Sequence, residues 1–217
     1  MNKNDHIIRL ETTNDYAEVE NLTREAFWNV YAPGCNEHYF VHVMRSHEDF
    51  IPELAFVIEL NGRIIGNIMY TKSRLIDEKG EVKTVISFGP ISIHPDFQRQ
   101  GYGKALIEHS FEKAVEMGYD TVVIFGNPGN YVSSGMKSCK RYNVCLEGGY
   151  FPTPLLVKEL KENVLDGRRW YFHESIASEP CNDEKAVEEF DSHFPPKKKQ
   201  WKPSQEEFYI YCHSSIG

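Results

Sequence analysis

Two runs of mainly apolar residues, 54–60 and 63–70, stand on either side of the dipeptide Asn61-Gly62. Asn-Gly is well suited to a type I′ turn, because both residues adopt positive φ angles at little cost. A second turn around residues 77–80 leads into a further apolar run over residues 82–93. The pattern predicts three antiparallel strands that follow one another along the chain.

Helical and buried segments surround these strands. Residues 7–10 form a candidate strand, and apolar positions recur at helical spacing over residues 13–30 and 38–47. After the third strand, a helix is predicted over residues 105–118 and a buried strand over residues 121–125. Strand, helix and strand in this order predict a parallel crossover.

The last third of the chain is more polar. Residues 154–160 and 168–173 have the pattern of two more strands. Residues 175–217 form a polar tail in which a helix is predicted over residues 183–190. The basic stretch at residues 195–202 carries flanking prolines and is expected to be a solvated loop rather than a phosphate-binding patch.

Composition narrows the classes of function. The 217 residues include 24 Lys plus Arg and 32 Asp plus Glu, a net charge of −8, and 41% of them are hydrophobic. This apolar content is enough for a buried core. Nucleic acid is an improbable partner for so acidic a chain, because neutralising phosphates requires an excess of basic residues.

Neither a membrane segment nor a metal site is predicted. No apolar stretch approaches the roughly 20 residues that cross a bilayer, and the first residues lack the apolar run of a secretory signal, so we expect a cytoplasmic protein. The five cysteines are widely spaced and are expected to be reduced. His38 and His42 have a spacing that suits zinc, but without a third ligand a substrate-facing helix is favoured.

The most informative segment begins inside the third strand, at Gly89-Pro90. A proline cannot donate to a strand ladder, so a bulge is expected there. The bulge would leave backbone groups of Ile91 and Ile93 without a partner strand. A ligand with amides along an extended chain could pair with them, and the pantetheine arm of coenzyme A carries two such amides.

Residues 98–104 then turn from the strand into the helix, and their glycines permit a close approach to the backbone. Successive N–H groups at this helix start, with Arg99 and Lys104, would hold a pyrophosphate. Two other nucleotide motifs do not fit. The dinucleotide fingerprint needs a small residue where Leu106 stands, and the P-loop needs Ser or Thr where Ala105 stands.

Residues 91–103 (ISIHPDFQRQGYG) resemble motif A of the GNAT superfamily of acetyl-CoA-dependent N-acetyltransferases. The signature Q/R-x-x-G-x-G/A is filled by Gln98, Gly101 and Gly103. Residues 88–90 and 123–128 are similar to a bacterial branch of GNAT proteins, and the resemblance spans roughly residues 7–174.

The resemblance implies an α/β (α+β) fold with a mixed, mainly antiparallel central sheet, a parallel pair splayed at the bulge, and flanking helices. It implies a GNAT acetyltransferase domain over residues 1–174, with acetyl-CoA as substrate, and leaves 175–217 as a C-terminal extension. Tyr131 becomes a general acid candidate because it stands four residues before Gly135, although Met136 replaces the usual aromatic. The residues implied to bind the coenzyme are Ile91, Ser92, Ile93, Gln98, Arg99, Gln100, Gly101, Tyr102, Gly103 and Lys104.

The general base is left open. The two central strands, residues 82–93 and 121–125, contain no carboxylate, so Ser87, His94 and Glu59 stand as alternatives. An N-acetyltransferase acting on a primary amine of a small molecule or peptide is the leading hypothesis. A non-catalytic acyl-CoA-binding module with the same fold is the alternative.

The extension holds more aromatic residues than a solvated tail requires. We therefore expect it to pack on the core or on a second subunit, which makes a homodimer possible. These residues are Phe190, Phe194, Trp201, Phe208, Tyr209 and Tyr211.

Overall fold

The Asn61-Gly62 turn joins β2 (Phe56–Leu60) to β3 (Arg63–Asp77) in a computed structural model that describes residues 6–217. Asn61 has a φ angle of 54° and Gly62 one of 76°, the positive values that a type I′ turn requires. The predicted hairpin is therefore confirmed. β4 (Val82–Ile93) follows antiparallel to β3, as the apolar pattern indicates.

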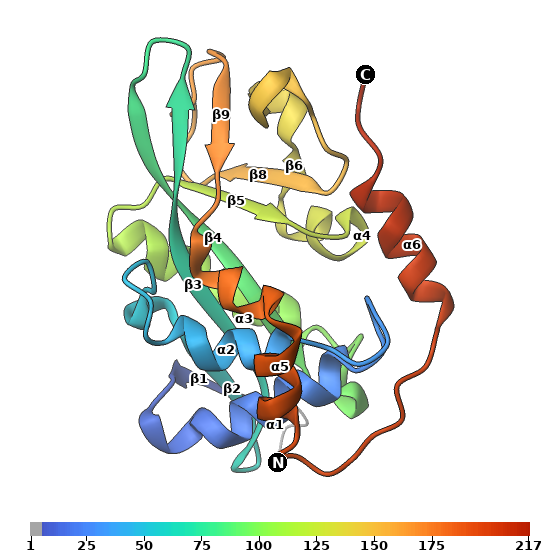
Figure 1. Cartoon of the computed structure of the whole chain (residues 1–217). Helices are drawn as coiled ribbons and strands as arrows, with labels where there is room; N and C mark the ends of the chain where they lie inside the picture. The colour runs from blue at the N-terminus through green and yellow to red at the C-terminus, as the bar shows by residue number, and fades with distance from the viewer. Residues whose placement is uncertain (1–5) are drawn as a thin grey trace.

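One mixed sheet is built outward from this hairpin, in the order β1-β2-β3-β4-β5-β8-β6 (Figure 1). β1 (His6–Leu10) lies antiparallel to β2, and β5 (Thr121–Phe125) lies parallel to β4. β9 pairs with the far end of β3. The expected fold class is confirmed. The other strands are β6 (Lys137–Ser138), β7 (Val144–Cys145), β8 (Leu155–Glu159) and β9 (Trp170–His173).

β4 bulges at Gly89-Pro90 and then leaves β5. Ile91 lies opposite Ile68 on β3, whereas Phe88 lies opposite Tyr70, so β4 has one more residue than β3 in this interval. Within the described part of the chain, β4 and β5 are joined only by the register pair Ile86 and Val122. The strands therefore splay, and one edge of β4 beyond the bulge is open.

Helices cover both faces of the sheet (Figure 1). α1 (Tyr16–Phe27) and α2 (Glu37–Met44) lie on one face, and α3 (Tyr102–Glu116) lies on the other. Each helix buries an apolar stripe, because its apolar residues recur at helical spacing. The first face is packed by Val19, Leu22, Val41, Met44, Val57, Ile64 and Met69, and the second includes Leu106, Ile107, Phe111, Ala114, Ile58, Ile65 and Ile124.

The C-terminal segment passes back over the first helices. α5 (Glu184–Asp191) agrees with the predicted helix, and Asp183 caps its start by accepting from two backbone N–H groups. α6 (Pro203–Cys212) was not anticipated, because its apolar residues do not gather on one helical face. The loop between them, at residues 195–202, is tied to the fold where Lys198 O accepts from Trp28 Nε1 at 3.1 Å.

Residues 126–154, between β5 and β8, hold short elements, including the single-turn helix α4 (Pro128–Tyr131). Asn127 caps this turn by accepting from the N–H of Gly129 at 2.9 Å, which agrees with its interpretation as a turn residue. None of the helices within residues 6–217 has both the length and the apolar composition that a bilayer crossing requires.

Candidate active site

The open edge of β4 presents the backbone of alternate residues. Ser92 pairs with β3, and the N–H of His94 donates to Ile65 O at 2.8 Å. In a strand, consecutive residues direct their N–H and C=O groups to opposite sides. The groups of Ile91 and Ile93 therefore point away from β3, toward the space that β5 leaves.

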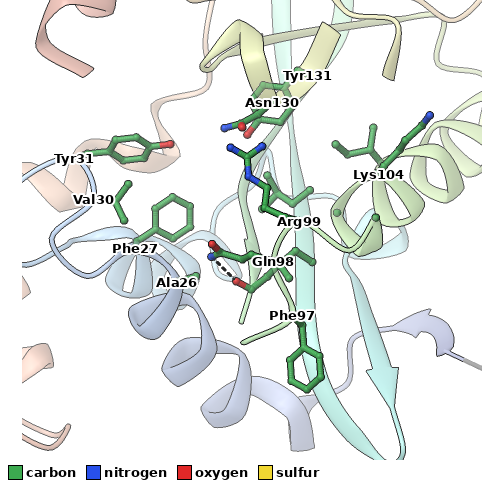
Figure 2. Close-up of a pocket in the computed structure, with 15 residues that line it drawn as sticks. Ala26, Phe27, Val30, Tyr31, Phe97, Gln98, Arg99, Lys104, Asn130 and Tyr131 are labelled. Carbon is green, nitrogen blue, oxygen red and sulfur yellow. Dashed lines mark hydrogen bonds between the residues drawn. The ribbon is translucent and has the colours of Figure 1, made fainter. Parts of the chain in front are cut away.

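Gln98 contacts this edge. Its side-chain amide donates to the carbonyl of Ile93 at 3.0 Å, so one lone pair of that carbonyl is already used (Figure 2). Ser92 differs from its neighbours, because its buried hydroxyl donates to Thr23 Oγ1 at 3.1 Å on the α1 side of the sheet. Since the Ser92 backbone pairs with β3, neither its backbone nor its side chain faces the open edge.

α3 begins at the same place and adds backbone donors. Gly101 is the N-cap, with a φ angle of 94° that favours glycine, and its carbonyl accepts from Ala105 N at 3.0 Å. The N–H groups of residues 102–104 precede the first intrahelical bond and face outward from the helix start. The positive end of the helix dipole lies here as well, so an anion would be stabilised at this point.

The open edge of β4 and the start of α3 line a cavity of about 440 Å³. Of the residues predicted to form the site, it is lined by Ile91, Ile93, Gln98, Arg99, Gly101, Gly103, Lys104 and Tyr131. We call it the strand-edge cavity. The end of α1 and the loop after it form another part of the cavity wall, which the sequence did not predict (Figure 2). The residues are Ala26 and Phe27 of α1, and Val30 and Tyr31 of the loop.

Besides Ser92, two predicted residues, Gln100 and Tyr102, do not line the strand-edge cavity. Gln100 is exposed, and its amide donates to Asp96 O at 3.0 Å. Tyr102 is buried, with its ring against those of His6 and Phe97. Their side chains therefore serve the local fold, and only their backbone atoms are available to a ligand.

The two predicted cations are placed differently. Arg99 is exposed, and Figure 2 shows its side chain extending toward Asn130 and Tyr131 across the cavity. Lys104 points away along α3, with Nζ 3.6 Å from Glu108 Oε1. Arg99 therefore reaches farther into the site than Lys104 does.

Tyr131 closes the inner end of the strand-edge cavity. Its ring packs on Phe88, with centroids 5.5 Å apart, and occupies the space that a Cβ on Gly126 would fill, 2.4 Å from Tyr131 Cε2. Burial, and to a lesser degree the nearby Tyr31, raise the pKa of the Tyr131 phenol well above its usual value. The hydroxyl is therefore held in its proton-donating form.

A second cavity, of about 210 Å³, lies on the other side of Tyr131. The two cavities share Phe27, Tyr31, Ile91 and Tyr131, so they are continuous around these residues. We call the second one the carboxylate cavity, because Glu37 and Glu174 line it. Its walls also carry aromatic rings, those of Phe27, Tyr31, Phe40, Phe88, Phe125 and Tyr131.

Both carboxylates of this cavity are perturbed by burial. Burial raises the pKa of Glu37 from 4.5 to about 7, against the opposing effect of hydrogen bonds from its own and the Asn36 backbone N–H. Burial also raises the pKa of Glu174. No motif points to Glu37 in the sequence, because an acidic residue at a helix start is ordinarily explained by the helix dipole.

Each of the three alternatives for the general base has a polar partner within the protein. Ser87 lines the carboxylate cavity but is hydrogen-bonded to Ser73, with the two hydroxyls 2.9 Å apart. Glu59 accepts from Arg9 Nε at 2.9 Å, and His94 Nε2 lies 2.8 Å from Arg63 Nη2. Glu59 and His94 line neither of the two cavities.

The histidines of α2 do not converge on one point. His38 Nε2 lies 3.1 Å from Asp191, whereas His42 Nδ1 lies 3.0 Å from Glu20. Glu37 and Phe40, not these histidines, present α2 to the carboxylate cavity. Within residues 6–217 no cluster of three potential ligands is found.

Cys35, His38 and Asp191 form a chain of contacts that is like a nucleophilic triad, with Cys35 Sγ 3.4 Å from His38 Nδ1. Burial raises the pKa of the Cys35 thiol well above its usual value and lowers that of His38 to about 4. Neither group is charged near neutrality. The thiol is therefore a packing residue rather than a nucleophile.

Comparison with known proteins gives the same family for the sequence. Residues 20–135 match the acetyltransferase (GNAT) family. The chain is 24% identical over 161 residues, 74% of its length, to the uncharacterized N-acetyltransferase YhbS of Escherichia coli K12, and the match covers 91% of that protein. A shorter match, 34% identical over 89 residues, covers 41% of the chain and 45% of N-alpha-acetyltransferase 30 of Dictyostelium discoideum.

Solved structures share the fold. The crystal structure of YhbS from Escherichia coli in complex with CoA has a TM-score of 0.68 at 20% identity, over 80% of this chain and 92% of that one. A GNAT family acetyltransferase from Brucella melitensis in complex with acetyl-CoA has a TM-score of 0.61 at 22% identity, over 79% of this chain and 97% of that one.

Proposed function

The chain belongs to the GNAT family of acetyltransferases, and we propose that it transfers an acetyl group from acetyl-CoA directly to a primary amine. The observation that carries the proposal is the strand-edge cavity itself. Its wall combines an open strand, a helix start and Arg99, and its inner end is Tyr131. These are the groups that an extended, anionic thioester substrate requires.

The substrate would lie along these groups in order. Backbone groups of Ile91 and Ile93 would bind the amides of pantetheine, as an added strand would. The N–H groups of residues 102–104, together with Arg99, would bind the pyrophosphate. Structures similar to this chain contain CoA and acetyl-CoA, which supports the assignment.

In direct transfer, the neutral amine attacks the thioester carbon and the carbon–sulfur bond then breaks. The oxygen that becomes negative would accept from the N–H of Ile91 or Ile93. Tyr131 would give its proton to the departing sulfur and regain one from the attacking nitrogen. Burial opposes formation of either a tyrosinate or a thiolate, so a transfer concerted with bond cleavage is favoured.

Replacing Tyr131 with phenylalanine tests this role. We expect Tyr131→Phe to lower kcat by about 10²-fold or more, the usual contribution of a positioned proton donor. The affinity for acetyl-CoA should be unchanged, because the ring is retained. Thiol release from acetyl-CoA with a panel of primary amines measures the first quantity, and calorimetry measures the second.

The same measurements distinguish an acetyltransferase from a non-catalytic acyl-CoA-binding module. An acyl-CoA-binding module would bind acetyl-CoA in calorimetry and release no thiol with any amine of the panel. Wild-type protein that behaves in this way would overturn the transferase proposal. A Tyr131→Phe variant with full turnover would leave transfer intact and remove Tyr131 as the acid.

The cellular setting is part of the proposal. All five cysteines are free, which is compatible with the reducing cytoplasm.

Tyr209 and Ile210 on α6 are 58% and 57% exposed, an apolar surface that a second copy of the chain would cover in a homodimer. Sedimentation of the full chain tests this association.

A further inference from the structure

The proposed transfer needs a neutral acceptor amine, and this inference rests on that proposed function. A free primary ammonium has a pKa of about 10, so near neutrality almost every acceptor molecule carries one proton too many. A group beside the reacting carbon must accept that proton. The alternatives from the sequence do not provide it. Glu59 is bound to Arg9, His94 lies outside both cavities, and the Ser87 hydroxyl is hydrogen-bonded to Ser73.

Glu37 lies where such a group is required. It is the first residue of α2 and lines the carboxylate cavity together with Tyr131 and the bulge of β4. Tyr31 lines the same cavity as both groups. The carboxylate of Glu37 and the phenol of Tyr131 therefore line one continuous space.

The Glu37 carboxylate is also chemically free. Its Oε2 accepts from the Asn36 N–H at 3.1 Å, and no ion pair within residues 6–217 includes it. Two acids of α1 are not free in this way, because Glu20 pairs with Arg45 at 2.7 Å and Glu25 with Lys197 at 2.7 Å. A half-buried carboxylate without a cation is stabilised by an ammonium that enters its cavity.

Glu174, the other acid of this cavity, is less suited to the role. It is an exposed residue at the end of β9 and also borders a separate groove that contains Lys72 and Arg74. An acceptor amine held at Glu174 would lie nearer to solvent than one held at the half-buried Glu37. Glu37 lines the carboxylate cavity and also an outer groove. The other titratable or charged groups that line these two are Tyr31, Cys35, Tyr131, Glu174, Cys181, Glu184, Glu188 and Lys199.

We propose that Glu37 is the general base of the reaction and that the carboxylate cavity binds the acceptor as its ammonium ion. Glu37 takes one proton from the ammonium, and the neutral nitrogen then forms its bond to the acetyl carbon. The second proton lost by the nitrogen goes to the sulfur through Tyr131. The products are the N-acetyl amine and the free thiol of coenzyme A, and Glu37 returns its proton to water.

The test compares wild type with Glu37→Gln, which keeps the size and hydrogen bonds of the side chain but cannot take the proton. Phenethylamine is a suitable acceptor, because six aromatic residues line the carboxylate cavity. We expect kcat/KM of the wild type to rise with pH through about 7, where Glu37 loses its proton. Glu37→Gln should be about 10²-fold slower or more at pH 7 and should approach wild type as pH nears 10.

Glu184→Gln is the matched control. Glu184 is an exposed residue of α5 that lines a groove on the outer side of Glu37 but not the carboxylate cavity. This variant should keep the wild-type pH profile. Calorimetry should give unchanged acetyl-CoA affinity for both variants.

Two outcomes would contradict the inference, and they are distinct. A Glu37→Gln variant with wild-type kcat/KM and an unshifted pH profile would remove Glu37 as the base while leaving acetyl transfer established. Wild-type protein that binds acetyl-CoA and releases no thiol with phenethylamine, an alkyl diamine or a peptide with a free N-terminus would overturn the proposed function itself.

Discussion

Tyr131 can occupy its place between the two cavities because Gly126 has no side chain. A Cβ at Gly126 would lie 2.4 Å from Tyr131 Cε2 and 2.9 Å from Cδ2, closer than packed atoms allow. Ring and glycine belong to different elements, the end of α4 and the residue after β5. The position of the proposed proton donor therefore depends on a residue that has no side chain.

Gly126→Ala should move the Tyr131 ring and lower kcat by about 10²-fold, comparable to the loss of a proton donor. The control is a double-mutant cycle with Tyr131→Ala, measured as thiol release. If the new methyl group acts only through the ring, adding Gly126→Ala to Tyr131→Ala should have no further effect. Full activity of the single Gly126→Ala variant would contradict this explanation.

The bulged strand β4 and helix α3 form the binding wall together. β4 contributes an open edge because the bulge ends its pairing with β5, and α3 contributes N–H groups because a helix start leaves them unpaired. Gly103 stands at the point where the two elements meet. A Cβ there would meet only Ile93 Cγ1, at an ordinary 3.5 Å, so the fold itself does not require this glycine.

Gly103→Val should therefore weaken acetyl-CoA binding at least tenfold, about 1.4 kcal/mol, by blocking approach to the helix start. Ala105→Val is the control, since it introduces the same β-branched residue into α3 at a position that does not line the strand-edge cavity. Calorimetry gives both affinities, and thermal unfolding shows whether the fold is kept. Equal affinity of Gly103→Val and wild type would be incompatible with the assigned pyrophosphate site.

Polar contacts of Asp191 join the C-terminal segment to α1 and α2. Arg24 of α1 is 1% exposed, and its Nε lies 2.6 Å from Asp191 of α5. Asp191 also contacts His38 of α2. Residues of α1 and α2 line the two cavities. The C-terminal segment contacts both helices and so stabilises the wall of the site.

Asp191→Asn should destabilise the protein by about 3 kcal/mol, because it leaves the buried Arg24 charge without its partner. Glu188→Gln, on the same helix, is the control. Glu188 is 68% exposed and lies 3.4 Å from Lys199, so its loss should cost less than about 1 kcal/mol. Urea unfolding gives both values. Equal free energies of unfolding for the two variants would show that the Arg24–Asp191 contact does not stabilise the protein.

Local patterns were enough to predict most of the sheet, the open edge of β4 and the start of α3. The hairpin at Asn61-Gly62, the bulge at Gly89-Pro90 and the helix start at Gly101 each follow from residues that are adjacent in the chain. α6 was missed because its apolar residues follow no helical stripe. Gln100 and Tyr102 belong to the predicted segment, but their side chains pack locally, and sequence spacing does not reveal that.

The sequence by itself determined the backbone chemistry of this protein, because turns, bulges and helix starts depend on the φ angles and missing side chains of neighbouring residues. Only the tertiary structure decided which side chains line the cavities together. Glu37 and Tyr131 are far apart in sequence, and burial in a shared cavity, not any motif, gives both their raised pKa values. Desolvation is a property of the packed molecule, so the candidate base became visible only when the chain was folded.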